Sequence, residues 1–347
     1  MVIASNSGGQ AAPVEAPAEA PLAASFGSRA FLAPMSGVTD IVMRRIAARF
    51  GAGLVISEMV ASDEFVRGSE EARIRAEGAG ISPHVVQLAG CDPHWLGEAA
   101  RLAEANGAAI VDINMGCPAK KVTGGWAGSA LMRDLDHALS LVHAAVKAVS
   151  IPVTVKMRLG WDAASLNAPE LARRAVDAGA AMITVHGRTR QQFYKGQADW
   201  AAIRAVREQG SFPLVANGDI HTGADARACL AQSGADCVMI GRAALGRPWL
   251  VGAIGAELAG REAKTLTLAE KLAVAREHYE GLLSLMGVAH GVRHARKHLA
   301  AYADDAMASG AAPDAELRRT LLTADQPQPV IAALEALFSD RCNRVAA

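Results

Sequence analysis

The residues with the clearest capacity for chemistry lie in one segment, 112–121, which reads Asp-Ile-Asn-Met-Gly-Cys-Pro-Ala-Lys-Lys. An apolar run precedes it, and Gly116 and Pro118 end the run abruptly, a pattern typical of a buried strand that opens into a tight turn. The turn presents a carboxamide, Asn114, and a thiol, Cys117, at the carboxyl end of a strand, where α/β proteins build their sites. Free Cys is also a common packing residue. This segment alone leaves both interpretations open.

The elements that must position these residues form a repeating pattern. Eight short runs rich in Val, Ile and Leu alternate with amphipathic or Ala-rich stretches; the runs cover 30–33, 54–57, 84–88, 109–113, 152–156, 181–185, 213–216 and 236–240. Eight strand–helix units over about 230 residues predict a (β/α)8 TIM barrel in the α/β class. A doubly wound open sheet is the main alternative, but it more often has fewer strands and a G-x-G-x-x-G motif after the first. The chain has no such motif there.

In a barrel, the residues that follow each strand face one mouth. Here they are polar at nearly every strand end: Pro34, Met35 and Ser36; Glu58; Gln87; Asn114 and Cys117; Lys156 and Arg158; His186 and Arg188; Asn217, Gly218 and Asp219; Gly241 and Arg242. The glycines and the arginine after runs seven and eight match the usual phosphate-binding corner of barrel enzymes, so we expect a phosphate-bearing ligand.

Several of these residues also have plainer interpretations. Lys156 could form a Schiff base or stabilise negative charge on a cofactor. It could also be a lysine at the rim of the barrel whose ammonium group is simply solvated. His186 could be a hydrogen-bonded residue of the core, and Asn217 and Asp219 could serve only to shape a turn. The functional interpretation gains weight because all of them fall at the same end of one barrel.

Composition limits the function classes. The chain has 347 residues, 51% of them apolar, with 35 basic and 35 acidic side chains, which argues against a bulk polycation such as a chromatin protein. Five cysteines without a C-x-x-C pair indicate a reduced, cytoplasmic protein. No apolar run is long enough to span a membrane. We expect a disordered tail at 1–28, the barrel at 29–258 and a helical domain at 259–347.

The helical domain carries a cluster of positive charge. Within the segment 291–298, Arg293, Arg296 and Lys297 occur without an intervening acid. Phosphate contacts to RNA and a solvated basic face are the two interpretations. His290, His294 and His298 are spaced four apart, but the segment offers no carboxylate or thiol partner, so no metal site is expected.

About ten motifs, in order and at consistent spacing from Arg29 to the C-terminus, resemble the tRNA-dihydrouridine synthases, most closely the bacterial B-type, nitrogen-regulation-protein-like branch. They include Ala33-Pro34-Met35-Ser36-Gly37-Val38-Thr39-Asp40, the segment 112–121, Val155-Lys156-Met157-Arg158, His186-Gly187-Arg188, Asn217-Gly218-Asp219 and Gly241-Arg242. A G-x-R-x-x-R-K-H segment like that at 291–298 occurs in the family's helical tRNA-binding domain. Ser36 stands where Ala is frequent in the family.

The resemblance implies FMN at the barrel mouth, reduced by NADPH, and reduction of the C5=C6 bond of a uridine in the D-loop of tRNA. It implies no membrane and no obligatory protein partner. Matched residue by residue, the resemblance implies that the flavin is lined by Pro34, Met35 and Ser36, with Gln87 and Lys156 at the isoalloxazine and His186 at its polar edge, and that its phosphate is held by Asn217, Gly218, Asp219, Gly241 and Arg242. It implies that Asn114 and Arg188 face the uracil and that Cys117 is the proton donor. In the helical domain, it implies that tRNA is contacted by Arg293, Arg296 and Lys297.

The implied chemistry is consistent with these side chains. After hydride reaches C6, the enolate at C5 and O4 needs a proton, and a thiol that is mostly protonated at neutral pH can donate it. Three alternatives remain: a dihydroorotate-dehydrogenase-like enzyme acting on a free pyrimidine, a Schiff-base aldolase built on Lys156, and a non-catalytic RNA-binding protein in nitrogen control.

Overall fold

The computed structural model describes residues 26–310 and 314–339, and eight parallel strands form its central sheet. The strands are β1 (Ala30–Leu32), β2 (Ile56–Ala61), β3 (Val85–Ala89), β4 (Ile110–Met115), β5 (Val153–Arg158), β6 (Met182–His186), β7 (Leu214–Asn217) and β8 (Cys237–Ile240). The strand order is β1-β8-β7-β6-β5-β4-β3-β2. A parallel bridge between Leu32 and Val55, just before β2, joins the two edges of the sheet. The TIM barrel expected from the eight apolar runs is confirmed.

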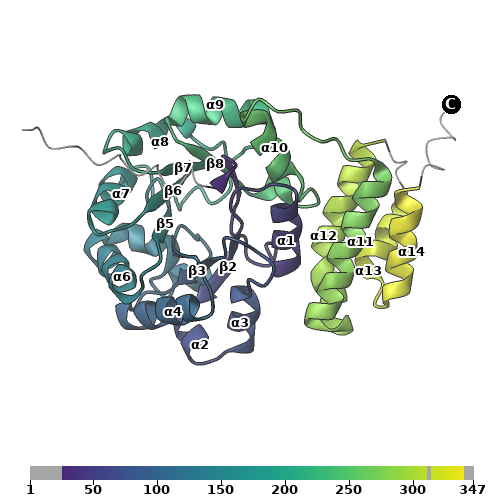
Figure 1. Ribbon diagram of the computed structural model, residues 1–347, viewed down its shortest axis with the longest axis horizontal. Helices are drawn as coiled ribbons and strands as arrows, with labels where there is room; N and C mark the ends of the chain where they lie inside the picture. Colours follow the sequence, from purple (N-terminus) through teal and green to yellow (C-terminus); the bar gives the residue numbers. More distant parts are fainter. Residues whose placement is uncertain (1–25, 311–313, 340–347) are drawn as a thin grey trace, which may run out of the picture.

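Helices surround the sheet as an outer ring (Figure 1). They are α1 (Ile41–Arg49), α2 (Ser62–Val66), α3 (Glu70–Ala76), α4 (Pro93–Ala105), α5 (Lys120–Thr123), η2 (Gly128–Arg133), α6 (Leu135–Ala148), α7 (Ala168–Asp177), α8 (Trp200–Arg207), α9 (Gly223–Ser233), η3 (Arg242–Ala244) and α10 (Leu250–Leu258). Side chains of Asp92, Asp134, Asp199 and Thr222 accept backbone N–H groups in the first turns of α4, α6, α8 and α9. These caps fix where each helix leaves its loop.

One boundary differs from the sequence-based prediction. The run 54–57 was expected to be the second strand, but β2 starts at Ile56 and continues to Ala61. Leu54 and Val55 instead contact β1, where the carbonyl of Leu54 accepts the N–H of Leu32 at 2.8 Å. Glu58 therefore lies inside a strand rather than at its end. The short helices α2 and α3 follow β2 and were not expected.

Apolar side chains fill the barrel interior below the mouth. This inner cluster comprises Phe31, Ala33, Leu54, Ile56, Val85, Ile110, Met182, Val215, Cys237 and Met239, all buried. Each fully buried large apolar side chain stabilises the fold by roughly 1.5–3 kcal/mol. Because the interior is packed with these residues, the polar side chains near the ends of the strands are confined to one mouth.

A helical domain follows, formed by α11 (Leu268–Met286), α12 (Val288–Ala308), α13 (Ala315–Thr323) and α14 (Pro327–Leu337). A capping box formed by Thr267 and Glu270 starts α11. The domain lies beside α1 of the barrel (Figure 1), where Arg49 and Glu277 form an ion pair at 2.6 Å. No helix in the described ranges is long and apolar enough to cross a membrane. Most of the tail expected at 1–28 lies outside the described residues.

Candidate active site

A cavity of about 540 Å³ opens at the carboxyl ends of the strands. Every residue expected at the mouth as a cofactor, substrate or catalytic residue of the barrel lines it: Pro34, Met35, Ser36, Gln87, Asn114, Cys117, Lys156, His186, Arg188, Asn217, Gly218, Asp219, Gly241 and Arg242. The volume is in the usual range of small-molecule sites. The structure thus brings together fourteen residues that are spread over more than 200 positions of sequence.

A hydrogen-bonded chain positions the thiol turn. Asn114 Oδ1 accepts the backbone N–H groups of Gly116 at 3.2 Å and Cys117 at 3.0 Å. Asn114 Nδ2 donates to Gln87 Oε1 at 2.8 Å, and Gln87 Nε2 donates to Asp112 Oδ2 at 2.7 Å. Asp112 is buried, and burial raises the pKa of its carboxyl group.

This chain fixes the orientation of both amides. Asn114 must present its oxygen to the turn because both partners there are N–H donors, so its amide nitrogen must face Gln87. Gln87 must then accept with its oxygen and donate to Asp112. One of the two Nε2 hydrogens of Gln87 is therefore used inside the protein, which leaves one for a ligand in the cavity.

Lys156 lies on β5 with its ammonium group in the cavity. Its Nζ donates to Asn217 Oδ1 at 3.1 Å, and Asn217 Nδ2 donates to the carbonyl of Met239 at 2.7 Å. Burial, together with the nearby positive charge of Arg158, lowers the pKa of Lys156 to about 8. A cation held under these conditions gains stability from an anionic ligand.

The expected phosphate corner has two parts. Gly218 has φ +123°, and a Cβ at this position would lie 2.7 Å from the Cβ of Ala198, so only Gly fits. Asp219 accepts Arg188 Nη2 at 2.6 Å and lies 3.6 Å from Arg242. The Asp219 carboxylate is therefore engaged with arginines, and Arg242, with a side chain 60% exposed, is the cation presented to a ligand.

Arg188 and His186 are held more tightly than the sequence indicates. Arg188 is 1% exposed and donates to the carbonyls of Lys195 and Gly196 as well as to Asp219. Burial and the surrounding cations lower the pKa of His186 well below its usual value, so its ring is neutral at neutral pH. Arg188 thus holds Asp219 and the loop after β6 in place. Its expected contact with the uracil base stays a prediction.

Arg158 and Tyr194 were not expected to have a role but line the cavity. Arg158 is buried, donates to the carbonyl of Gly116 at 2.7 Å, and reaches the carbonyl of Phe193 at 2.8 Å. It therefore ties the Cys117 turn to the loop after β6. The guanidinium groups of Arg158 and Arg242 lie 5.5 and 5.1 Å from the Tyr194 ring centroid. No sequence pattern singles out Tyr194, because its neighbours come from three strands.

A row of stacked side chains leads away from the cavity, and we call it the aromatic–arginine row. The guanidinium of Arg133 lies 5.3 Å from the ring centroid of Trp126 and 5.0 Å from that of Trp161. Arg190 lies 4.6 Å from Trp161 and 4.8 Å from Phe193, which lines the cavity. Trp126 is 58% exposed and has φ +60°. Such alternation of rings and guanidinium groups suits unstacked nucleotide bases.

The three cations of the helical domain separate in the structure. Arg296 Nη2 pairs with Asp325 at 2.8 Å, and Lys297 Nζ donates to the carbonyl of Gly37 in the barrel at 2.5 Å. Arg293 is exposed and forms no ion pair within the described residues. Arg293 is thus the one of the three whose charge has no protein partner in the part of the chain that the structure describes.

The cavity is lined by four basic side chains, those of Lys156, Arg158, Arg188 and Arg242, and by one carboxylate, that of Asp219. Fold and site together define a TIM-barrel protein with a thiol in a cavity whose basic side chains suit an anionic ligand. The family model described as dihydrouridine synthase matches residues 31–342, and the chain belongs to this family.

Three relatives agree with this assignment, and one solved structure shares the fold. A "Probable tRNA-dihydrouridine synthase" of Rhizobium leguminosarum bv. phaseoli is 57% identical over 80% of this chain and 86% of its own length. One of Rhodobacter capsulatus is 52% identical over 89% and 94%. The "tRNA-dihydrouridine synthase B" of Xanthomonas axonopodis pv. citri is 44% identical over 91% and 98%. A 2-naphthoyl-CoA reductase structure (TM-score 0.50, 12% identity, 68% and 48% covered) shares the fold alone.

Proposed function

We propose that this protein is a tRNA-dihydrouridine synthase that uses FMN and NADPH to reduce the C5=C6 bond of a D-loop uridine. The observation that carries the proposal is the cavity itself, in which the Cys117 thiol and a cation-rich corner share one space. Family membership and relatives whose names carry this activity support it.

The residues present fit a phosphorylated flavin. The glycine at 218, where a side chain would collide with Ala198, leaves the backbone bare at the corner, and Arg242 supplies an exposed positive charge beside it. Pro34 and Met35, followed by Ser36, offer an apolar wall on the loop after β1, beside the loop after β8 that carries Arg242. In this proposal bound FMN supplies the hydride, while the chain's own residues bind, orient and protonate.

Lys156 and Gln87 would meet the polar edge of the flavin ring. Lys156 stabilises negative charge because its ammonium group is shielded from water and close to Asn217. Gln87 has one Nε2 hydrogen free after its bond to Asp112, and its orientation is fixed by Asn114. Neutral His186 adds polarity without charge.

Cys117 would donate the proton that completes the reduction at C5 of the uracil. Its turn is held from two sides, by Asn114 through the backbone N–H and by Arg158 through the carbonyl of Gly116. A general acid needs such a fixed position, because proton transfer depends on hydrogen-bond reach to one atom. The role that this geometry supports best for Cys117 is donation of a proton from its thiol to a carbon atom of the substrate.

The substrate would be tRNA rather than a free pyrimidine, because two features outside the cavity suit RNA. These are the aromatic–arginine row at the rim and Arg293 on the helical domain. A base in an RNA loop leaves its stack at low cost, and neighbouring bases can then stack on exposed rings.

The test uses unmodified tRNA, purified holoprotein and NADPH, with dihydrouridine measured by nucleoside analysis and mapped by position. We expect dihydrouridine in the D-loop of tRNA and none from free uridine or orotate under the same conditions. Turnover of a free pyrimidine with inert tRNA would instead identify a small-molecule reductase. Tight tRNA binding without NADPH-dependent turnover would identify the non-catalytic RNA-binding alternative. Borohydride trapping at Lys156 would identify an aldolase.

A further inference from the structure

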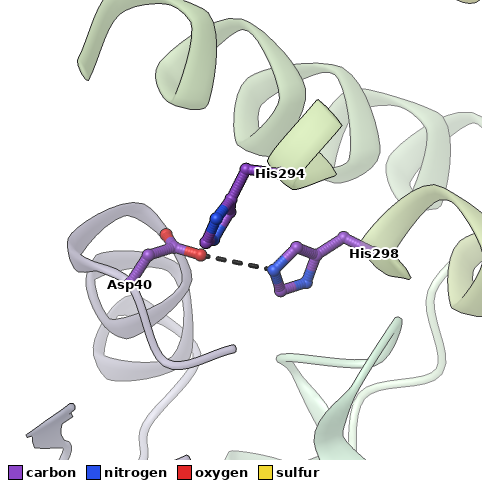
Figure 2. A group of neighbouring side chains, drawn as sticks. All are labelled: Asp40, His294 and His298. Carbon is purple, nitrogen blue, oxygen red and sulfur yellow. Dashed lines mark ion pairs between the residues drawn. The ribbon is translucent and has the colours of Figure 1, made fainter. Parts of the chain in front are cut away.

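Three histidines and one carboxylate meet where the helical domain packs against the barrel. Asp40 caps the start of α1, and His294 and His298 project from one face of α12 toward it (Figure 2). One ligand atom from each of these three residues lies within 4.8 Å of the other two. The side chains of Asp40 and His298 are each 2% exposed. No metal was expected because the segment 291–298 has no carboxylate; Asp40 of the barrel supplies one.

The hydrogen bonds within this cluster are incomplete. Nδ1 and Nε2 of His298 and Nε2 of His294 are buried but have no hydrogen-bond partner among the described residues. His298 Nε2 lies 3.4 Å from Asp40 Oδ2, outside hydrogen-bonding geometry. Buried polar atoms without partners are unfavourable and rare, so each needs an explanation. A cation bound between the rings and the carboxylate would be coordinated by Nε2 of His294 and by one ring nitrogen of His298, and would so satisfy two of these three atoms.

A third histidine lies on the other side of the carboxylate. His278, on α11, approaches Asp40 Oδ2 with Nε2 at 3.1 Å, and its Nδ1 lies 3.0 Å from the Tyr302 hydroxyl. The rings of His278 and His298 are 4.3 Å apart at their centroids. Both nitrogens of His278 are therefore used, one on Tyr302 and one on Asp40, so this ring orients the carboxylate as an outer-shell partner of a metal ligand does.

The charge next to the cluster has its own partner. Lys297 lies between His294 and His298 in sequence, but its Nζ donates to the carbonyl of Gly37 in the barrel loop at 2.5 Å. The two rings are therefore not hydrogen-bonded to this ammonium group, and imidazole nitrogens of this kind are common metal ligands.

We propose that Asp40, His294 and His298 bind one divalent transition-metal ion, with Zn²⁺ the best match, and that His278 holds the Asp40 carboxylate in place. Imidazole nitrogens with a single carboxylate oxygen suit Zn²⁺ and its first-row neighbours rather than Mg²⁺ or Ca²⁺. Tetrahedral Zn²⁺ with bonds of about 2.0–2.1 Å places its donors about 3.4 Å apart, the separation of Asp40 Oδ2 and His298 Nε2. The ligand atom of His294, within 4.8 Å of the other two, would have to move inward to reach the same separation, and its ring is only half-buried.

The metal would connect the two parts of the chain next to the cavity. Asp40 follows Thr39, whose Oγ1 accepts the N–H of Met35 at 2.9 Å, and Met35 lines the cavity. A metal that holds Asp40 against α12 therefore also fixes the loop that forms one wall of the cavity. The role is structural, since neither the three ligands nor His278 lines the cavity.

The test is metal analysis of the full-length holoprotein. After dialysis against Zn²⁺ and removal of the excess, we expect about one equivalent of zinc per chain. Removal of the metal by a chelator should lower Tm, and added Zn²⁺ at about 100-fold over Kd should restore it by about 3–6 °C. Flavin content, read from absorbance, is recorded separately, so loss of metal and loss of cofactor are distinguishable.

Three variants make the result specific. His294→Ala and Asp40→Asn should abolish stoichiometric zinc and the Tm response; Asn keeps the helix cap, and Ala suits a helix interior. His290→Ala, one turn earlier and exposed on the same helix, is the matched control and should keep both. With Co²⁺, the spectrum should lack a thiolate charge-transfer band. Absence of metal and of a Tm response in the wild type, or a thiolate band that locates the ion at a cysteine, would overturn the proposal.

Discussion

Asn114 Oδ1 accepts two successive backbone N–H groups of the thiol turn, those of Gly116 at 3.2 Å and Cys117 at 3.0 Å. A short carboxamide that captures nearby backbone donors is a common way to fix a tight turn. Here the same side chain also bonds to Gln87 on the neighbouring strand. The position of Cys117 therefore depends on β3 and β4 together, and the thiol faces the cavity from a rigid support.

Replacement of Cys117 by Ala tests the proton-donor role. Cys117→Ala should keep flavin and tRNA binding but slow uridine reduction by about 10²–10⁴, the usual contribution of a positioned general acid. Reduction of the flavin by NADPH should be unchanged, because that half-reaction needs no proton at C5. Stopped-flow measurement of both half-reactions checks this. Cys91→Ala, which removes another half-buried thiol, is the control; loss confined to the NADPH half-reaction of Cys117→Ala would refute the role.

Arg242 is the test of the phosphate corner. Arg242→Ala should weaken FMN binding by about 2 kcal/mol, or about 30-fold, because a charge-assisted contact to phosphate is lost. Riboflavin, which lacks the phosphate, should bind both proteins equally. Arg227→Ala on α9 removes a similarly exposed arginine and should have no effect. Fluorescence titration of the apoprotein measures these affinities, and an equal loss for FMN and riboflavin would place the phosphate elsewhere.

The lowered pKa of Lys156 gives a pH-dependent prediction. With a pKa of about 8, Lys156 is mostly charged at pH 7 and mostly neutral at pH 9 in the apoprotein. An anionic flavin phosphate or ring edge favours the charged form and raises this pKa, so binding at pH 9 should take up a proton. At pH 7 uptake should be small, because the proton is already bound.

Calorimetry in two buffers of different ionisation enthalpy measures this proton uptake. Lys156→Met should abolish the uptake at pH 9 and leave the pH 7 value nearly unchanged. Equal uptake in the wild type and Lys156→Met at pH 9 would mean that another group titrates. His186 is an unsuitable source, because its lowered pKa keeps it neutral at both values.

The fold and most of the cavity were predictable because parallel strands carry their carboxyl ends to one mouth. A polar residue after an apolar run is therefore near every other such residue, whatever the sequence distance, and Gln87, Lys156 and Asn217 meet for this reason. The second strand was misplaced because its first apolar residues, 54 and 55, pair with β1 before β2 begins.

Contacts between elements that do not belong to the same repeating strand–helix pattern could not be predicted. Asp40 and His298 lie 3.4 Å apart although they come from different domains, and periodicity within either helix gives no sign of the other. The same applies to the direction in which a basic side chain points. Arg296 and Lys297 are adjacent in sequence, yet Arg296 pairs with Asp325 and Lys297 donates to the carbonyl of Gly37. Side-chain direction depends on packing that sequence spacing does not encode.

The exposed end of the aromatic–arginine row predicts an RNA contact. Trp126→Gly should weaken tRNA binding by about 1–3 kcal/mol, the range for loss of one base-stacking ring. Gly suits φ +60°, so the turn should keep its shape. FMN affinity should not change. Val288→Ala, which truncates another exposed apolar side chain, is the control; wild-type tRNA affinity in Trp126→Gly would show that the row does not bind RNA.

The cations of α12 should have separable effects, because only one of them is without a protein partner among the described residues. Arg293→Ala should weaken tRNA binding and reduce the slope of log K against log salt by about one, the loss of one phosphate contact. Arg296→Ala should mainly lower stability, since it removes the pair with Asp325, and Lys297→Ala should mainly disturb the Gly37 loop at the cavity. Filter binding at several salt concentrations, with Tm and flavin content for each variant, distinguishes these outcomes. A slope that falls equally in all three variants would mean that Arg296 and Lys297 leave their partners to bind phosphate when tRNA is present.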